Sequence, residues 1–160
     1  MSGAARFGAV PSPGSEQLTD VRFNHMELTF PRGSLDASTL ADIYGFYGDV
    51  FGWSNAEDDV AGEPAHILGA GTQFILLAEA DTPIVSPGLD HLGLEVADRP
   101  AVDALLDECK RRQAKDDRVE LLEYDDIVKA EYGITQHFFY LRYLLPIWFD
   151  VHCVEMSTPV

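Results

Sequence analysis

The sequence is poor in basic residues, in cysteine and in long apolar runs, and each shortage excludes a class of function. Eleven Lys and Arg stand against 27 Asp and Glu, which gives a formal net charge of −16 over 160 residues. Nucleic-acid binding and adsorption to anionic membranes both depend on clustered basic side chains, so neither partner is expected. The excess of acid is typical of a highly soluble surface, and steering of a cationic ligand is the less favoured explanation.

Cys109 and Cys153 are the only cysteines, and their surroundings lack the CxxC or histidine-rich spacing of a zinc knuckle. We expect both to be buried free thiols. No apolar run approaches the length of a membrane span, and residues 1–10 lack the apolar core of a secretory signal. These features predict a cytoplasmic protein with no membrane partner.

The chain does contain enough apolar material for one domain with a substantial core, since 46% of its residues are hydrophobic and 11% aromatic. Composition also divides the chain into segments. A start rich in Gly, Ser and Pro precedes the first stretch of alternating pattern, and a middle segment containing Pro separates it from the second. We therefore expect a tail, two modules and a connection, with the modules forming one domain over about 21–155: tail 1–18, first module 19–80, connection 81–87, second module 88–156.

Residues 23–30 alternate as a strand does, and the alternation separates two kinds of side chain. Met26, Leu28 and Phe30 share one face, while His25 and Glu27 share the other with Phe23 and Thr29. The first set is typical of a core. The second places an imidazole beside a carboxylate, a combination that a strand needed only for stability would seldom carry.

The same layout returns at 89–96, where Leu92, Leu94 and Val96 form the apolar set and His91 shares the other face with Glu95. The two histidines are 66 residues apart (91 − 25). This spacing indicates that the chain contains the same structural unit twice.

The remaining pattern predicts one helix and three strands after each of these first strands. A helix over about 37–51 is capped by Asp36 or Ser38 and ends at Gly52, and Asp98 caps a second over about 100–113. Gly69-Ala70-Gly71 is read as the turn of a hairpin. The strands are expected at 65–68, 73–80, 119–124, 135–143 and 147–154, with 55–60 either an edge strand or a loop.

Three stretches carry a resemblance to a known family. Phe46-Tyr47-Gly48-Asp49-Val50-Phe51-Gly52-Trp53 looks like the end of its first helix, residues 88–98 look like its fifth strand, and Ile147-Trp148-Phe149-Asp150-Val151 looks like its last strand. Taken in this order over residues 21–155, they resemble the vicinal oxygen chelate superfamily, which contains glyoxalases, bleomycin and fosfomycin resistance proteins and extradiol dioxygenases. The resemblance implies an α+β fold of two βαβββ modules, with a curled, mostly antiparallel sheet around a cavity and the helices on its outer face.

The resemblance also implies a metal site in that cavity. Family ligands occupy the first and last strands of the modules, which carries over to His25, His91 and Asp150, with a fourth position somewhere in 73–79. Two imidazoles and one carboxylate suit Fe, Mn, Zn, Co or Ni as divalent ions. Asp150 stands where the family commonly has Glu, and Tyr143-Leu144-Leu145-Pro146 replaces the family's usual turn before that strand.

Other residues of the same faces are candidates for further roles. Glu27 is the candidate catalytic base, with a solvated or hydrogen-bonded carboxylate at the cavity mouth as the alternative. Substrate contacts are expected from Phe23, Trp148, Arg142 and His152. Asp150 and His152 share a strand face, so they could instead form a buried pair that needs no metal.

Two functions remain open at the level of sequence. The first is a glyoxalase- or dioxygenase-like metalloenzyme that acts on a small oxygen-chelating substrate by lyase, isomerase or oxygenase chemistry. The second is a metal-free small-molecule binding or drug-sequestering protein of the bleomycin-resistance type, with aromatic surfaces for a flat ligand. In either case the resemblance implies a homodimer, whose cavity lies within one chain or across the two.

Overall fold

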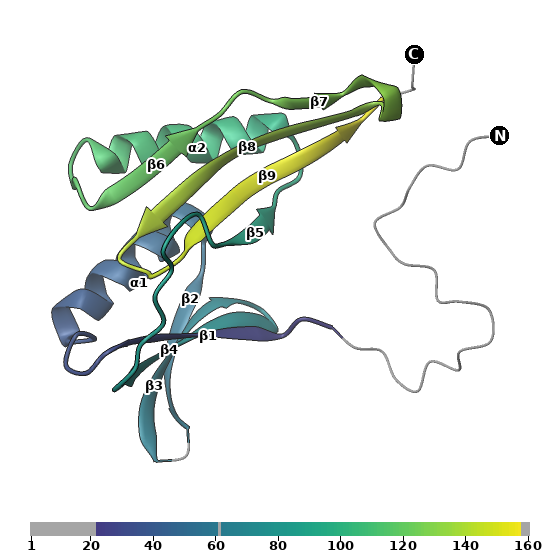
Figure 1. Ribbon diagram of the computed structural model, residues 1–160. Coiled ribbons are helices and arrows are strands. Elements are labelled where there is room, and N and C mark those ends of the chain that lie inside the picture. Colours follow the sequence, from purple (N-terminus) through teal and green to yellow (C-terminus); the bar gives the residue numbers. More distant parts are fainter. Residues whose placement is uncertain (1–21, 61, 158–160) are drawn as a thin grey trace, which may run out of the picture.

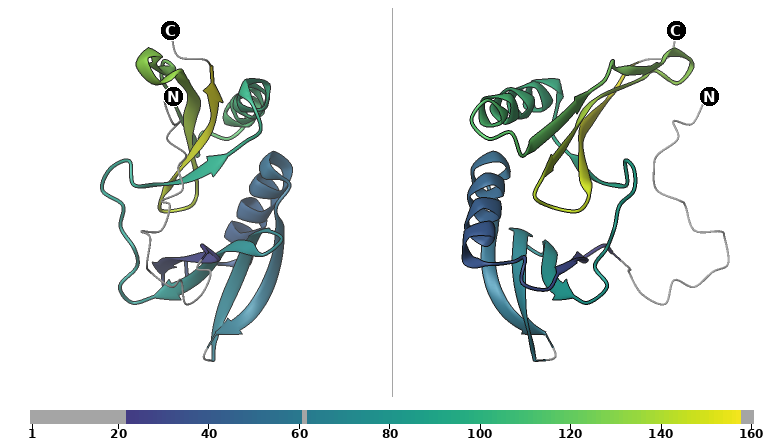
Figure 2. Two further views of the ribbon diagram at one scale, coloured as in Figure 1. Left: turned by 90° about the vertical axis from the view of Figure 1, so that its right-hand side faces the viewer. Right: turned by 60° about the vertical axis from the view of Figure 1, so that its left-hand side comes forward.

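The computed structural model describes residues 22–60 and 62–157, which form two βαβββ units in succession (Figure 1). The expected tail at 1–18 lies outside the described residues. Figure 2 shows the two sheets inclined to each other, with both helices on the same side of the molecule. None of the helices described is long and apolar enough to cross a membrane.

The first unit is a four-stranded sheet with one helix. Its strands follow the order β1-β4-β3-β2, in which β1 pairs with β4 in parallel and the other neighbours are antiparallel. The elements are β1 (His25–Pro31), α1 (Ala37–Phe51), β2 (Ser54–Val60), β3 (Glu63–Ala70) and β4 (Gln73–Ala80). The stretch at 55–60, which the sequence left between strand and loop, is therefore a strand at the sheet edge.

The second unit repeats this plan with one addition. Its sheet follows the order β5-β9-β8-β6, with β5 parallel to β9, and a short strand β7 also pairs with β8. The elements are β5 (His91–Glu95), α2 (Arg99–Gln113), β6 (Val119–Glu123), β7 (Ile127–Lys129), the 3-10 turn η1 (Ala130–Tyr132), β8 (Ile134–Tyr143) and β9 (Trp148–Met156). The sequence pattern missed β7, because three residues are too few to show an alternation.

The helix ends follow the predicted signals. Asp36 accepts a hydrogen bond from Thr39 N, and Asp98 accepts one from Ala101 N, so each caps its helix. Gly52 ends α1 in the left-handed region, with a φ of 69°. Of the two caps proposed for α1, the structure selects Asp36.

The hairpin between β3 and β4 turns later than the sequence indicated. Gly69 and Ala70 belong to β3, and the turn follows at Gly71, which has a φ of 61°. Gly69 is needed for a different reason: a Cβ there would lie 2.5 Å from Gln73 O and 2.6 Å from Phe74 Cα. The backbones of the two strands approach too closely at this point for any side chain.

Each sheet has one face covered by a helix and one open face. The apolar sets predicted for the first strands lie on the covered faces, where Leu28 is fully buried and Leu92 and Leu94 are half-buried. His25 and His91 lie on the open faces, as the alternation predicted. Cys109 and Cys153 are buried free thiols.

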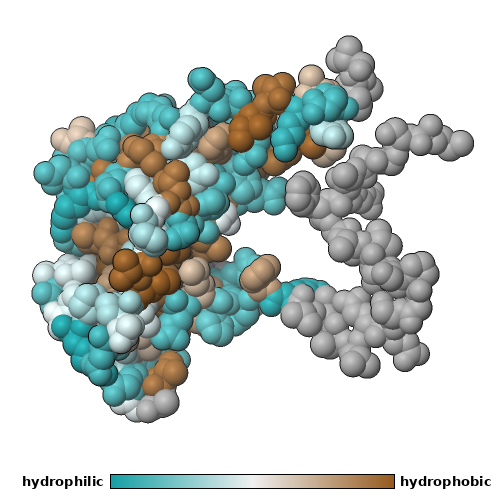
Figure 3. Space-filling view, viewed as in Figure 1, coloured by the Kyte–Doolittle hydropathy of each residue, from teal (hydrophilic) through white to brown (hydrophobic). Residues whose placement is uncertain are grey.

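The two units share a core across their junction. Phe149 of β9 is fully buried, and its ring meets three rings of the first unit edge-on, those of Tyr47, Phe51 and Trp53, at 5.5, 6.1 and 5.7 Å. Tyr47 Oη donates a hydrogen bond of 3.0 Å to the carbonyl oxygen of Tyr143. Figure 3 shows hydrophobic residues gathered at mid-height, where the two units meet.

Candidate functional site

His25 begins strand β1, and its ring is held by two neighbours. It stacks on Phe74 at 5.0 Å with the ring planes 9° apart. Asn24 Nδ2 donates to the Thr72 carbonyl at 2.6 Å, which fixes the amide so that Asn24 Oδ1 faces His25 Nδ1 at 2.9 Å. An amide oxygen can only accept, so the proton is on Nδ1, and Nε2 of this exposed ring carries a lone pair.

His91 occupies the matching position in β5 and has the same tautomer. Its Nδ1 lies 2.7 Å from the Leu89 carbonyl oxygen, which can only accept. The Nε2 atom therefore carries the lone pair, and it lies 4.0 Å from Asp150 Oδ2. A ring nitrogen bound to a backbone carbonyl, with the other nitrogen free, is the arrangement that metal-ligating histidines use.

Among the described residues, Asp150 is the one carboxylate buried on this open face: only 7% of the residue is exposed, and the parallel register sets it opposite Gly93. Its Oδ2 lies 3.4 Å from His152 Nδ1. Its Oδ1 has no hydrogen-bond partner among the described residues, and the same holds for His152 Nδ1. A buried carboxylate oxygen without a partner is costly unless a ligand completes it.

Gly93 makes room for this arrangement. A Cβ at Gly93 would lie 3.3 Å from His152 Cε1, so the absence of a side chain lets the His152 ring pack over the strand beside Asp150. Sequence reasoning treated Gly93 only as part of the alternation. Its role becomes visible once the register places it between His91 and Glu95, opposite Asp150.

Trp148 and Arg142 form a second part of the open face. The Arg142 guanidinium lies over the Trp148 ring at 4.4 Å and donates two hydrogen bonds of 2.7 Å to Glu120. The hydrogen bonds to Glu120, together with its negative charge, raise the pKa of Arg142. The sequence left open which face of β8 is covered, and the structure places Tyr140 and Arg142 on the open one.

Tyr140 connects these groups to His91. Its ring meets the His91 ring edge-on at 5.2 Å, and it lies opposite Asp150 in the antiparallel register of β8 and β9. Burial raises the pKa of the Tyr140 hydroxyl, and the nearby negative charge of Asp150 raises it further. The phenol is therefore kept protonated beside the carboxylate and can serve as a hydrogen-bond donor.

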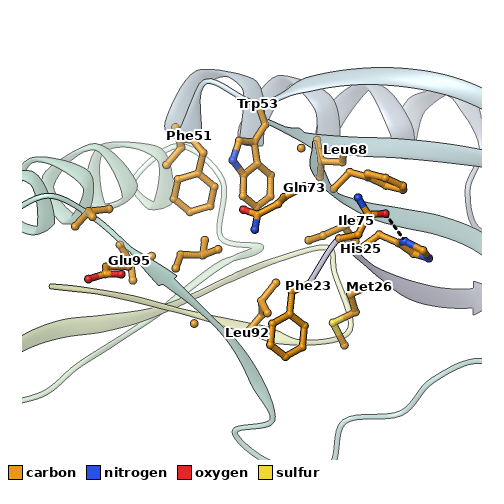
Figure 4. A pocket seen from close by; sticks show the side chains of 18 of the residues that line it. Phe23, His25, Met26, Phe51, Trp53, Leu68, Gln73, Ile75, Leu92 and Glu95 are labelled. Carbon is orange, nitrogen blue, oxygen red and sulfur yellow. Dashed lines mark hydrogen bonds between the residues drawn. The ribbon is translucent and has the colours of Figure 1, made fainter. Parts of the chain in front are cut away.

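A cavity of about 670 Å³ lies between the two units (Figure 4). It is lined largely by residues of the helix-covered faces, such as Ile75 and Leu92, and of the proposed metal ligands it includes His25 but not His91 or Asp150. His25 is at one end and Glu95 at the other, and most of the wall between them is apolar. Trp53 and Phe51, which the sequence pattern assigned only to a helix stop, are part of that wall. Phe23 is 95% exposed and also lines it. Glu27 is exposed and follows the alternation of His25 on β1.

The described residues of one chain bring His91, Asp150 and His152 together, but they do not add His25. Within residues 22–60 and 62–157, no three His, Cys, Asp or Glu side chains converge closely enough to hold one metal ion. The donors present fit a divalent metal as part of a site: a free Nε2 on each first-strand histidine and an unpartnered carboxylate oxygen on Asp150. One chain supplies an incomplete set.

Comparison with known proteins finds the same fold in solved structures. No family model and no curated protein matches the sequence. The fosfomycin resistance protein FosX from Listeria monocytogenes aligns with a TM-score of 0.59 and 14% identity, over 84% of this chain and 92% of that one. A Bacillus anthracis protein assigned to the glyoxalase family also gives 0.59, with 13% identity over 88% and 100% of the two chains.

A further structure of the Listeria protein is a complex with Mn(II) and a sulfate ion, and it aligns with a TM-score of 0.56 and 12% identity over 84% of this chain and 93% of that one. Identities this low establish the fold alone. They agree with the two βαβββ units, the parallel pairing of each first strand with its last and the helix-covered faces described above. The chain has the fold of the vicinal oxygen chelate superfamily.

Proposed function

We propose that the protein is a glyoxalase- or dioxygenase-like metalloenzyme that acts on a small substrate with two adjacent oxygen atoms. The observation that carries the proposal is the matched state of the two first-strand histidines. Each holds its Nδ1 proton in a hydrogen bond and leaves Nε2 free, and the second faces a buried carboxylate with an unpartnered oxygen. A purely structural histidine has no need of this arrangement at both repeat positions.

The proposed ligands are His91 and Asp150 of one chain with His25 of a second copy, and His152 is the neighbour that orients Asp150. A divalent metal bound there would supply Lewis acidity or a site for activating oxygen. The Mn(II) complex of the structurally similar Listeria protein supports a divalent ion of this class. We keep Fe, Mn, Zn, Co and Ni as the candidates, because this donor set does not select among them.

The chain's own residues would bind and orient the substrate. Glu27 is proposed as the base, because it follows the alternation of His25 on an exposed strand. Tyr140 would donate a hydrogen bond to a substrate oxygen, since its phenol stays protonated beside Asp150. Phe23 offers an exposed ring surface, whereas Trp148 is only 6% exposed and would reach a substrate only where Arg142 moves off its ring. An anionic substrate group would compete with Glu120 for the Arg142 guanidinium.

A homodimer is the proposed assembly, because the donors of one chain do not converge. Strands β1 and β5 are edges of their sheets, so β1 of one copy can lie beside β5 of the second copy, and β5 of the first beside β1 of the second. An isologous pair built in this way would carry two identical sites. Sedimentation equilibrium should therefore give twice the chain mass, and a monomer at working concentration would contradict this assembly.

Metal binding tests the proposal directly. The protein is loaded separately with each of the five ions, dialysed and analysed for bound metal. We expect stoichiometric binding of at least one ion, lost in His91→Ala and Asp150→Asn and retained in the control His66→Ala, whose histidine lies beside Tyr44 and under α1. Absence of stoichiometric metal in the unmodified protein with all five ions would refute the proposal.

A metal-free binding protein is the second candidate, and the cavity of about 670 Å³ favours it. This volume lies in the range of small-molecule sites, and the wall is mostly apolar. Chelator-treated protein would then bind an apolar ligand undiminished, and His91→Ala would leave that binding unchanged. Loss of all ligand binding on chelation would exclude this second function.

A further inference from the structure

The open face of the second sheet carries a cluster of three aromatic rings, which we call the aromatic corner: Tyr124, which follows β6, and Phe138 and Tyr140 of β8. The rings of Tyr124 and Phe138 are nearly parallel, 5.8 Å apart with planes at 11°. Tyr140 stands at right angles to both, at 5.7 Å from Tyr124 and 5.9 Å from Phe138. The three rings therefore present two perpendicular surfaces.

The aromatic corner is not part of the protein core. The residues that alternate with it on β8, Phe139 and Leu141, are fully buried on the face that α2 covers. Tyr124 is 49% exposed, and Phe138 and Tyr140 are half-buried. Three large rings on the uncovered face of a sheet form an exposed apolar patch, and such patches mark interaction sites.

The position of the aromatic corner connects it to the candidate metal ligands. In the register of β8 and β9, Tyr140 lies opposite Asp150 and Phe138 lies opposite His152. Side chains directly opposite on one face are in contact range. The side chains that carry the unpartnered Asp150 Oδ1 and His152 Nδ1 are thus direct cross-strand neighbours of the Tyr140 and Phe138 rings. Apolar rings beside a few convergent polar atoms are the composition of a small-molecule site.

The loop that carries Tyr124 is held in place by contacts on the other side of the sheet. Asp126 accepts a hydrogen bond of 2.9 Å from Arg99 Nη1 and lies 3.0 Å from Nδ1 of the buried His137. Hydrogen bonding from His137 is the main reason that the pKa of Asp126 is lowered. These contacts order the chain two residues beyond Tyr124, so its ring is positioned before any ligand arrives.

We propose that the aromatic corner binds a planar aromatic group of the substrate, which identifies the substrate class as an aryl compound with adjacent oxygens. This inference rests on the proposed function, because it places those oxygens at His91 and Asp150. A flat ring can stack on one surface of the corner and meet the other edge-on, both favoured geometries for aromatic pairs. A second copy of the chain is the less suitable occupant, since a stable interface covers roughly 800 Å² per partner and the corner is three side chains.

Two hydroxamates test the proposal, because both chelate a divalent metal through adjacent oxygens and only one carries a ring. The dissociation constants of benzohydroxamate and acetohydroxamate are measured by calorimetry on Mn(II)-loaded protein. We expect the ring to improve affinity about ten-fold, the gain typical of one good aromatic contact. Tyr124→Ala should abolish this preference, whereas Tyr124→Phe, which keeps the ring, should retain it. Tyr132→Ala is the matched control, since Tyr132 is 61% exposed and outside the corner.

The outcomes separate the inference from the function beneath it. Equal affinity for the two hydroxamates, with binding that depends on Mn(II), would overturn the aryl subsite and leave the metalloenzyme intact. If neither Mn(II) nor any of the other four candidate ions changes the binding of either compound, the proposed function fails. The ratio of the two dissociation constants in metal-free protein then decides whether the aryl subsite exists. An unchanged preference in Tyr124→Ala, together with a weaker dimer in sedimentation, would assign the corner to self-association and refute the proposal.

Discussion

Two glycines near the candidate site should respond oppositely to alanine. At Gly69 the new Cβ would meet Gln73 O at 2.5 Å and Phe74 Cα at 2.6 Å, and backbone atoms cannot rotate away. We expect Gly69→Ala to lower the free energy of unfolding by about 3 kcal/mol, the upper part of the range for overpacking. The edge of the cavity would shift with the β3–β4 hairpin.

At Gly93 the nearest atom is His152 Cε1 at 3.3 Å, the end of a partly exposed side chain that can move by a few tenths of an ångström. Replacing a strand glycine by alanine also lowers the conformational entropy of the unfolded chain, which stabilises the folded state by about 0.5–1 kcal/mol. The two effects offset, so the free energy of unfolding of Gly93→Ala should stay within about 1 kcal/mol of the unmodified protein. The expected cost is a displaced His152 ring and weaker metal binding.

Urea unfolding followed by circular dichroism measures both variants under the same conditions. The control is Gly88→Ala, because nothing lies within 4 Å of a Cβ at Gly88. Equal losses of stability for the two variants would contradict the pairing of β5 with β9 at Gly93, and an unchanged stability of Gly69→Ala would contradict the pairing of β3 with β4.

Two further predictions address the junction of the units and the pH dependence of stability. The Phe149 ring fills the space among three aromatic side chains of the first unit. Urea unfolding should therefore show a loss of about 4 kcal/mol in the free energy of unfolding for Phe149→Ala and of about 1 kcal/mol for Phe149→Leu. Similar losses for both variants would contradict this packing. Glu79 accepts hydrogen bonds from Gly33 N and Leu35 N, and these lower its pKa below the ordinary 4.5. The resulting stability is present above about pH 4.5 and is lost as the pH falls below it. Glu79→Gln should show a shallower loss of stability in acid, and an unchanged pH profile would exclude Glu79 as a contributor.

The fold could be predicted well from the sequence because its signals are local. Alternation assigned Leu28 to the covered face and His25 to the open one, and both placements are confirmed. Asp36, Gly52 and Asp98 act as the helix caps and stop that their residue types favour. The turn after β3 was placed too early, because a glycine required by close backbone contact looks the same in sequence as one required by a turn.

The candidate site could be predicted only in part, because it depends on register between strands. The sequence singled out His91, Asp150 and His152. The structure places them on one face, with a ring nitrogen of each histidine within 4.0 Å of Asp150 Oδ2. It did not indicate that Gly93 makes room for His152. The aromatic corner was also missed as a unit, because Tyr124 comes from a loop whose position is set by Arg99 and His137 rather than by its own neighbours.

The assembly of the site is the central claim, and a mixing experiment tests it most directly. His25→Ala and Asp150→Ala each remove one proposed ligand, so each variant alone should lose stoichiometric binding of the ion that the unmodified protein holds. If the site joins two copies, subunit exchange between the variants yields mixed dimers with one intact site. Random exchange then restores about one quarter of the metal capacity of the unmodified protein. Recovery near that fraction is the predicted result, and no recovery after demonstrated exchange would contradict a site shared between two copies.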